Sequence, residues 1–242
     1  LYRIDLATGA ATAVGAGVGQ GFQIEALAFD PTTGQLYGLD DDSDLLVTVD
    51  INTGIATPVG PLGFNVDEGG IAISSSGAII ASDEDGDTYS VNKSTGAGTL
   101  IGDSAIETDN LTFAGGLLYG VDRFSAELFT IRTLDATPTL VGPLGVSTSS
   151  QHGLSFDPVS GFLYLGDSFG SAGNIYRVNR TTGAATLVAS APFGLASLAI
   201  QPNQTIAAVP VLGVWGPLPL ALLVVLLGIF RKQAQRASRE AG

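Results

Sequence analysis

Five copies of one short pattern recur along the chain, and no other feature restricts the fold as strongly. The copies begin 45, 42, 40 and 47 residues apart and cover 1–15, 46–60, 88–102, 128–142 and 175–189. Each reads as an alternating strand, usually a Thr-Gly turn, and a second short strand. Because glycine supplies the positive φ that a tight hairpin needs, the pattern predicts one hairpin repeated five times.

A second hairpin separates the copies. It spans 26–40, with equivalents at 70–83, 110–122 and 153–167, and a lone first strand follows at 196–200. Four short strands every 40–47 residues is the period of a propeller blade. We therefore predict an all-β protein, a β-propeller of four-stranded blades over residues 1–200. A β-solenoid, whose coils are usually shorter, is the competing architecture.

The order of the strands predicts how the ring is completed. If the strands of a blade are named a to d outward from the axis, the chain holds c and d of one blade, four full blades, and a final a. One strand b is missing, and the first residue is Leu1 rather than Met. We therefore expect an N-terminally truncated chain. A five-bladed ring needs one upstream strand, and six or seven blades need one or two upstream repeats.

The C-terminal segment predicts a membrane helix. Residues 211–230 are twenty residues without a charge, enough to cross a hydrocarbon core of roughly 30 Å. Arg231, Lys232 and Arg236 follow at once, which places the C-terminus in the cytoplasm and the β domain outside. We predict a linker at 201–208, a sorting motif and transmembrane helix at 209–230, and a basic tail at 231–242. A buried core helix is the alternative.

The same segment carries a resemblance to a sorting signal. Its residues Val209, Pro210, Leu212, Trp215 and Gly216, followed by the apolar span and the basic cluster, resemble the IPTLxxWG type. That type is similar to the PEP-CTERM signals handled by exosortases in Gram-negative bacteria. Val209 and Val211 replace the isoleucine and threonine of that type. The repeats likewise resemble the Leu-Tyr-x-Ile-Asp-x-x-Thr-Gly propellers of such surface proteins.

The resemblance implies a location and a partner. It implies an inner-membrane protein with its propeller in the periplasm, an exosortase-type sorting enzyme as partner, and cleavage near Pro210 before release to the cell surface or beyond. A permanent single-span anchor is the alternative.

Charge restricts the partners of the repeat domain. Residues 1–207 hold 22 acidic and six basic side chains, so the net charge is −16, which repels phosphate backbones and argues against nucleic acid as a partner. In a propeller the b–c and d–a loops share one face, here called the acidic face, and 17 of the 23 acidic residues fall on it. These are Glu25, Asp40, Asp41, Asp42, Asp44, Asp67, Glu68, Asp83, Glu84, Asp85, Asp87, Asp103, Glu107, Asp109, Asp122, Glu127 and Asp167. Such a face favours cations or a basic partner.

Two runs on that face are candidate Ca²⁺ sites. They contain Asp83, Asp85 and Asp87, and Asp40, Asp42 and Asp44. Hard cations take several oxygen ligands from one turn, but Gly86 is misplaced for an EF-hand and no distant glutamate follows. The alternative is structural: an aspartate recurs at one repeat position, at residues 40, 83, 122 and 167, and caps the b–c turn.

Catalytic motifs are weak. Residues 166–170 match G-x-S-x-G and His152 is the only histidine, but a nucleophile elbow needs a strand that turns into a helix. We predict no catalytic residue and a loop position for His152. The leading hypothesis is a non-enzymatic surface or matrix protein that binds or adheres to an unidentified extracellular partner. The rival is a propeller hydrolase or lactonase with an extracellular substrate.

Aromatic residues recur in register between the blades. We predict that they pack the blades rather than form a ligand cage. They are Phe29, Phe113, Phe156, Tyr37, Tyr119 and Tyr164.

Overall fold

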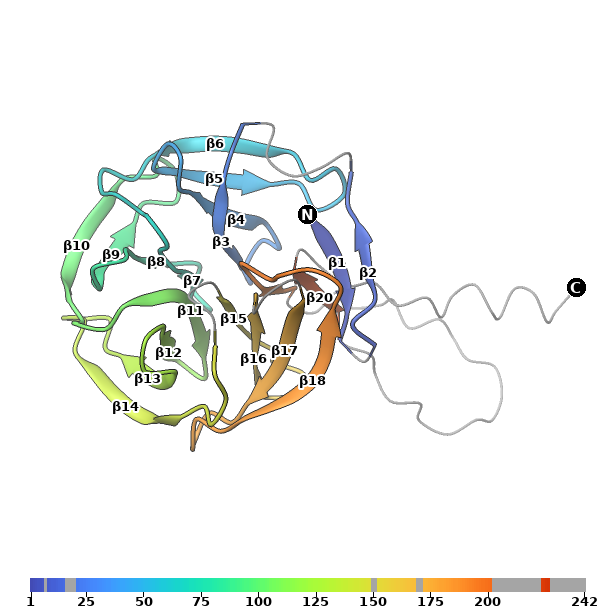
Figure 1. Ribbon diagram of the computed structural model, residues 1–242. Helices are drawn as coiled ribbons and strands as arrows, with labels where there is room; N and C mark the ends of the chain where they lie inside the picture. The colour runs from blue at the N-terminus through green and yellow to red at the C-terminus, as the bar shows by residue number, and fades with distance from the viewer. Residues whose placement is uncertain (7, 16–20, 149–151, 169–171, 202–222, 227–242) are drawn as a thin grey trace, which may run out of the picture.

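The computed structural model describes residues 1–6, 8–15, 21–148, 152–168, 172–201 and 223–226. Every regular element in these ranges is a β-strand. The strands form five antiparallel four-stranded sheets arranged as blades around one axis (Figure 1). The predicted all-β propeller is therefore confirmed, and the solenoid alternative is not what the chain adopts.

Four blades are continuous in sequence, and each runs outward from the axis. The first contains β3 (Ile24–Phe29), β4 (Leu36–Asp40), β5 (Leu45–Val49) and β6 (Ala56–Pro61). The second contains β7 (Ile71–Ile73), β8 (Ile79–Ser82), β9 (Asp87–Val91) and β10 (Gly98–Asp103). The third contains β11 (Thr108–Ala114), β12 (Leu117–Asp122), β13 (Glu127–Ile131) and β14 (Pro138–Pro143). The fourth contains β15 (His152–Phe156), β16 (Leu163–Asp167), β17 (Gly173–Val178) and β18 (Ala185–Ala191).

The fifth blade is assembled from distant parts of the chain. Its order is β19 (Ala199–Ile200), β20 (Leu223–Leu226), β1 (Tyr2–Asp5) and β2 (Ala11–Ala13). β20 pairs antiparallel with both neighbours, with Val225 opposite Arg3 on one side and Ala199 on the other. β20 therefore occupies the position of the strand b that we expected from an upstream segment.

This strand lies within the segment for which a transmembrane helix was predicted. Residues 223–226 belong to the predicted transmembrane helix, yet they are extended. An unpaired strand edge exposes a row of backbone donors and acceptors, and the apolar sequence of β20, with two β-branched valines, suits strand pairing there. The rest of 209–230 lies outside the described residues. Within the described ranges, no helix has the length and apolar composition needed to cross a bilayer.

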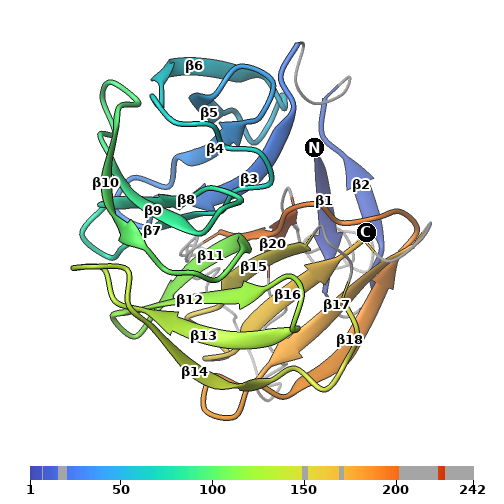
Figure 2. The ribbon, with the colours of Figure 1, turned by 60° about the vertical axis from the view of Figure 1, so that its left-hand side comes forward.

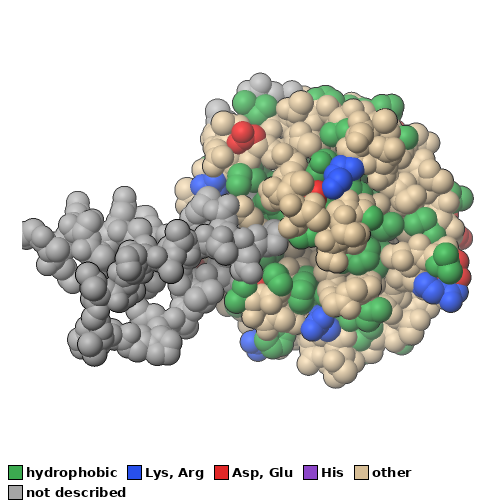
Figure 3. Space-filling model, turned by 180° about the vertical axis from the view of Figure 1, so that it is seen from behind, with side chains coloured by type: hydrophobic (Ala, Val, Ile, Leu, Met, Phe, Trp, Pro, Cys, Tyr) green, Lys and Arg blue, Asp and Glu red, His purple; other side chains and the backbone are tan. Residues whose placement is uncertain are grey.

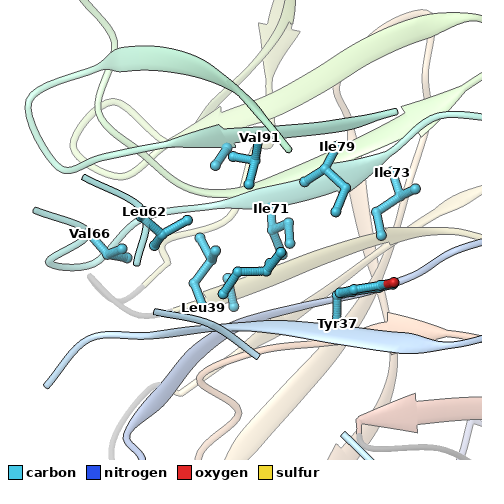
Figure 4. Close-up of a cluster of buried hydrophobic side chains, with 11 residues drawn as sticks. Tyr37, Leu39, Leu62, Val66, Ile71, Ile73, Ile79 and Val91 are labelled. Atoms are coloured by element: carbon cyan, nitrogen blue, oxygen red, sulfur yellow. The ribbon is translucent and has the colours of Figure 1, made fainter. Parts of the chain in front are cut away.

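The ring closes at its inner strands and between its blades. β3, β7, β11, β15 and β19 each contact the next, and β19 also contacts β3. Apolar side chains fill the space between adjacent sheets, as between the first two blades, where Leu39 and Leu62 meet Ile71 and Ile79 (Figure 4). Ile4 packs among residues of the fourth blade, and Leu1 among residues of the first. The fifth blade thus contacts both of its neighbours (Figure 2).

The Thr-Gly pattern of the repeat forms the c–d turns. In the first blade, the Asp50 carboxylate accepts hydrogen bonds from the backbone N–H groups of Asn52 (2.7 Å) and Thr53 (3.0 Å). Gly54 then adopts a φ of 74°. Asn92 and Asn179 accept equivalent bonds in the second and fourth blades. An Asp or Asn side chain followed by a glycine at positive φ closes a tight turn without strain.

Each of these turns also touches the outer strand of the preceding blade. A Cβ added to Gly60 would lie 2.1 Å from the carbonyl oxygen of Thr95, and one added to Gly96 would lie 2.2 Å from that of Gly60. The fifth blade approaches its neighbours in the same way. A Cβ added to Gly9 would lie 2.2 Å from the carbonyl oxygen of Ser190 in the fourth blade, and one added to Gly15 would lie 1.9 Å from that of Thr53 in the first blade. We call these approaches the interblade glycine contacts. They explain why the repeat usually ends in glycine.

Candidate functional site

The inner strands carry polar residues at the ends that open on the acidic face. Glu25 lies on β3, Asp109 on β11 and His152 on β15, each near the start of its strand. Glu68 lies just before β7. Because the inner strands all run from the d–a loop to the a–b turn, these four side chains converge at the same mouth of the ring. Only scattered acidic side chains appear on the opposite face (Figure 3).

Arg123 joins carboxylates from two blades. Its guanidinium contacts Glu68 and lies 2.8 Å from Glu107, 3.7 Å from Asp109 and 3.9 Å from Glu84. Only 11% of the Arg123 side chain is exposed. Burial acts to lower the pKa of Arg123, but the carboxylates, Asp109 first, raise it overall. Arg123 therefore remains charged and compensates part of the negative charge around it.

His152 corrects a sequence prediction. It is the first residue of β15 and is completely buried, rather than being a polar loop residue. The Asn110 amide of β11 donates to its Nδ1 and, at 3.3 Å, to its backbone carbonyl. Burial lowers the pKa of His152 to about 4, so the imidazole is neutral at pH 7. His152 thus lies at the contact between the third and fourth blades.

Several buried polar atoms at this mouth have no hydrogen-bond partner. Among the described residues, both Asp109 carboxylate oxygens, Asn110 Oδ1 and His152 Nε2 have no hydrogen-bond partner. Burial raises the pKa of Asp109 to about 8, against the lowering effect of Arg123 and with further repulsion from Glu68. The side-chain oxygens of Asp109 and Asn110 at the mouth therefore lack hydrogen-bond donors, and the Nε2–H group of His152 lacks an acceptor.

The raised pKa of Asp109 predicts a pH dependence of stability. The folded state holds a proton on Asp109 that the unfolded state loses near pH 4, so this contribution falls as the pH rises toward about 8. The lowered pKa of His152 has the opposite effect, because its contribution to stability rises with pH, but only below the ordinary histidine pKa of 6.5. We expect Asp109→Asn to raise the unfolding free energy at pH 8 by about 1–3 kcal/mol and to flatten its decline between pH 6.5 and 8. Denaturant titrations at both pH values measure this, and an unchanged decline would contradict it.

The candidate calcium residues do not gather into a metal site. Asp83 accepts hydrogen bonds from the backbone of Asp87 (2.9 Å) and from the Tyr89 hydroxyl (2.9 Å). Asp40 accepts from Gln23 N (2.6 Å), and Asp44 from Val66 N (2.9 Å). In the described part of the chain, no group of three or more His, Asp or Glu side chains could hold a metal ion. These carboxylates instead fix loops. Asp42 and Asp85 are exposed.

The alternative, that the recurring aspartate caps the b–c turn, is right in two blades. Asp122 accepts hydrogen bonds from Phe124 N (3.0 Å) and Ser125 N (2.7 Å), and Asp83 accepts from Asp87 as described. The prediction is wrong at Asp40, which binds the preceding d–a segment instead.

The predicted aromatic residues lie in the core, and some of them also line a cavity, whereas the predicted sorting residues lie outside the described residues. Tyr37, Tyr119 and Tyr164 are buried between blades, as expected. The three phenylalanines pack there too, but they also line a cavity on the axis, which the sequence did not reveal. The sorting residues and the basic cluster lie outside the described residues. They are Val209, Pro210, Leu212, Trp215, Gly216, Arg231, Lys232 and Arg236.

Fold and site together define a β-propeller built from a tandem repeat, with an acidic mouth on one face. Residues 1–194 match the family described as a repeat of unknown function (DUF6923), and the chain belongs to that family. No curated protein matches the sequence.

Solved structures share the fold at low sequence identity. A structural genomics protein of unknown function from Bacteroides thetaiotaomicron VPI-5482 is 15% identical, with a TM-score of 0.60, over 79% of this chain and 56% of that chain. A chain of a nidogen/laminin complex is also 15% identical, with a TM-score of 0.57, over 82% of this chain and 80% of that chain. The chain thus spans little more than half of the first of these proteins. At such identity the likeness shows the fold alone.

Proposed function

We propose that this chain is a non-enzymatic propeller that binds a cationic partner through its acidic face. The observation that carries the proposal is the mouth at which Glu25 and Glu68 converge around Asp109, where Arg123 is the one cation among the described residues that pairs with Glu68 and Asp109. A concentration of uncompensated charge of one sign raises the local concentration of ligands of the other sign. One similar fold comes from a nidogen/laminin complex, and a protein-binding role of that kind suits a rigid disc with a charged face.

A second group of carboxylates extends the acidic face beyond Arg123. Burial, and then the neighbouring Asp41 carboxylate, raise the pKa of Glu25. Burial, and then Asp67, raise the pKa of Asp41. Repulsion between negative charges contributes to both shifts after burial, and a bound cation would relieve that part.

Titration calorimetry with deca-lysine tests the binding proposal. We expect deca-lysine, but not deca-glutamate, to bind at 20 mM NaCl and to weaken strongly at 300 mM. Asp41→Asn/Asp67→Asn should weaken binding by about threefold to tenfold. The matched control is Asp5→Asn/Asp50→Asn, which removes two charges from c–d turns where Asn92 and Asn179 serve in other blades. Equal weakening in both double variants, or no binding at low salt, would overturn the proposal.

We further propose that the chain is exported and membrane-sorted. The order of motif, apolar span and basic cluster in residues 209–236 supports an exosortase-type partner, with the propeller in the periplasm before its release to the cell surface or beyond. Residues 223–226 cannot both complete the fifth blade and lie in a bilayer. The two uses are compatible if another strand takes the place of β20 when the segment is inserted.

The sorting proposal predicts a shorter mature protein. Intact-mass measurement of protein isolated from the cell surface should show an end near Pro210. Surface protein that retains residues 231–242 would contradict processing and would favour a permanent anchor.

Catalysis is outside this proposal. A neutral, fully buried His152 whose Nδ1 already faces Asn110 is poorly placed to activate a serine. A serine-directed activity probe tests the rival hydrolase or lactonase. Covalent labelling that disappears in Ser168→Ala would favour that rival over a purely binding role.

A further inference from the structure

A cavity of about 400 Å³ lies on the propeller axis at the mouth opposite the acidic face. It is lined by the C-terminal halves of the inner strands and by the a–b turns that follow them, including Leu27 and Phe29 of β3, Leu111 and Phe113 of β11, and Phe156 of β15. Strand residues rise by about 3.3 Å each, so Phe113 lies roughly 13 Å along β11 from Asp109. The cavity is thus separate from the acidic mouth.

The lining is mostly apolar, and the hydroxyl groups of Thr112 and Ser155 in it have partners. Thr112 Oγ1 accepts a hydrogen bond from Phe156 N (3.1 Å), and Ser155 Oγ accepts one from Ile200 N (2.9 Å). Cavities of 300–1,000 Å³ with such linings are typical of small-molecule sites. The chemistry of the walls therefore suits a hydrocarbon or aromatic body.

The rim adds one positive charge. The Arg180 guanidinium lies 5.0 Å from the centroid of the Phe156 ring, and a Cβ added to Gly115 would lie 3.3 Å from Arg180 Nη1. Phe156 and Gly115 both line the cavity. Among the described residues, no carboxylate pairs with Arg180, whereas Lys93 pairs with Asp30 at 2.6 Å. Arg180 is therefore a cation at the edge of an apolar cavity with no anion assigned to it.

We propose that this cavity binds an amphiphilic carboxylate, with its apolar body on the axis and its carboxylate paired with Arg180. A guanidinium binds a carboxylate through two parallel N–H donors, and the flat Phe156 ring holds it in place by a cation–π contact. The site is independent of the acidic face, whose charge would repel the same ligand.

Calorimetry with three ten-carbon probes tests the proposal on the full chain at pH 8, below the concentrations at which the probes form micelles. We expect decanoate to bind about tenfold more tightly than decan-1-ol, and decylammonium to bind more weakly than decanoate. Arg180→Gln should weaken decanoate binding about tenfold and leave decan-1-ol unchanged. Ala28→Leu, which adds volume at the cavity wall, should weaken both probes.

Arg177→Gln is the matched control. Its guanidinium also lies over a phenylalanine of the fourth blade, at 4.4 Å from the Phe162 centroid, but Phe162 does not line the cavity. Arg177→Gln should bind decanoate like the unaltered chain. The proposal fails if decanoate does not bind at millimolar concentration, if decan-1-ol binds equally well, or if Arg177→Gln weakens decanoate as much as Arg180→Gln does.

Discussion

Replacing Arg123 by leucine is expected to lower the unfolding free energy by about 2–4 kcal/mol at pH 8. Removing one member of a buried ion pair typically costs about 3–5 kcal/mol, and we reduce this range because Glu84 and Glu107 are each 37% exposed, where solvent screens them. Without the guanidinium, the carboxylates of Glu68, Glu84 and Glu107 repel one another and disfavour an ionised Asp109. Denaturant titration with a two-state fit measures the loss.

The pH dependence of that loss identifies its cause. In Arg123→Leu the pKa of Asp109 should rise further, so the folded state retains its proton to higher pH and stability falls more steeply as the pH rises. The loss should therefore be smaller at pH 5 than at pH 8. Arg132→Leu, which removes an exposed guanidinium from a c–d turn, should change the midpoint little. A loss that is the same at both pH values would show that Arg123 acts by packing rather than by charge.

Replacing Gly96 by alanine is expected to cost about 3 kcal/mol or more. The residue has a φ of 81°, which costs an L-residue about 1 kcal/mol. In addition, the new methyl group would lie 2.2 Å from the carbonyl oxygen of Gly60, so that either the turn or the adjacent blade must move. The larger part of the loss should therefore come from the contact between the first two blades.

Gly34→Ala separates the two contributions. Gly34 has a φ of 76°, but no atom lies within 4 Å of an added Cβ. Its substitution should cost only about 1 kcal/mol. Equal losses for Gly34→Ala and Gly96→Ala would mean that the interblade glycine contacts do not restrict the packing of the blades.

The sequence predicted the blades because their signals are local. Alternating strands such as Leu45–Val49 and the turns after Asp50 and Asn92 are specified within a few residues, and the repeat multiplies each signal. The fifth blade could not be completed in this way. An uncharged, largely apolar run of twenty residues suits a bilayer and a paired strand alike, and the partner edges of β20 lie about 25 and 220 residues away along the chain.

The site was predicted only in outline. Topology alone placed the acidic residues on one face, but the contacts of their side chains depend on three-dimensional distances. Arg123 was overlooked although a signal existed, since it is the only basic residue in the b–c and d–a loops of that face. The axial cavity could not be predicted from the periodic phenylalanines. Their spacing indicates packing between blades, whereas the cavity depends on the space that the five inner strands leave around the axis.

A blade assembled from distant parts of the chain closes the ring of five. The most direct measurement is the unfolding free energy of Gly9→Ala, since Gly9 has a φ of 70° and an added Cβ would lie 2.2 Å from Ser190 O of the fourth blade. A closed ring predicts the same loss as for Gly96→Ala, about 3 kcal/mol or more. A loss of only about 1 kcal/mol, equal to that of Gly34→Ala, would contradict closure.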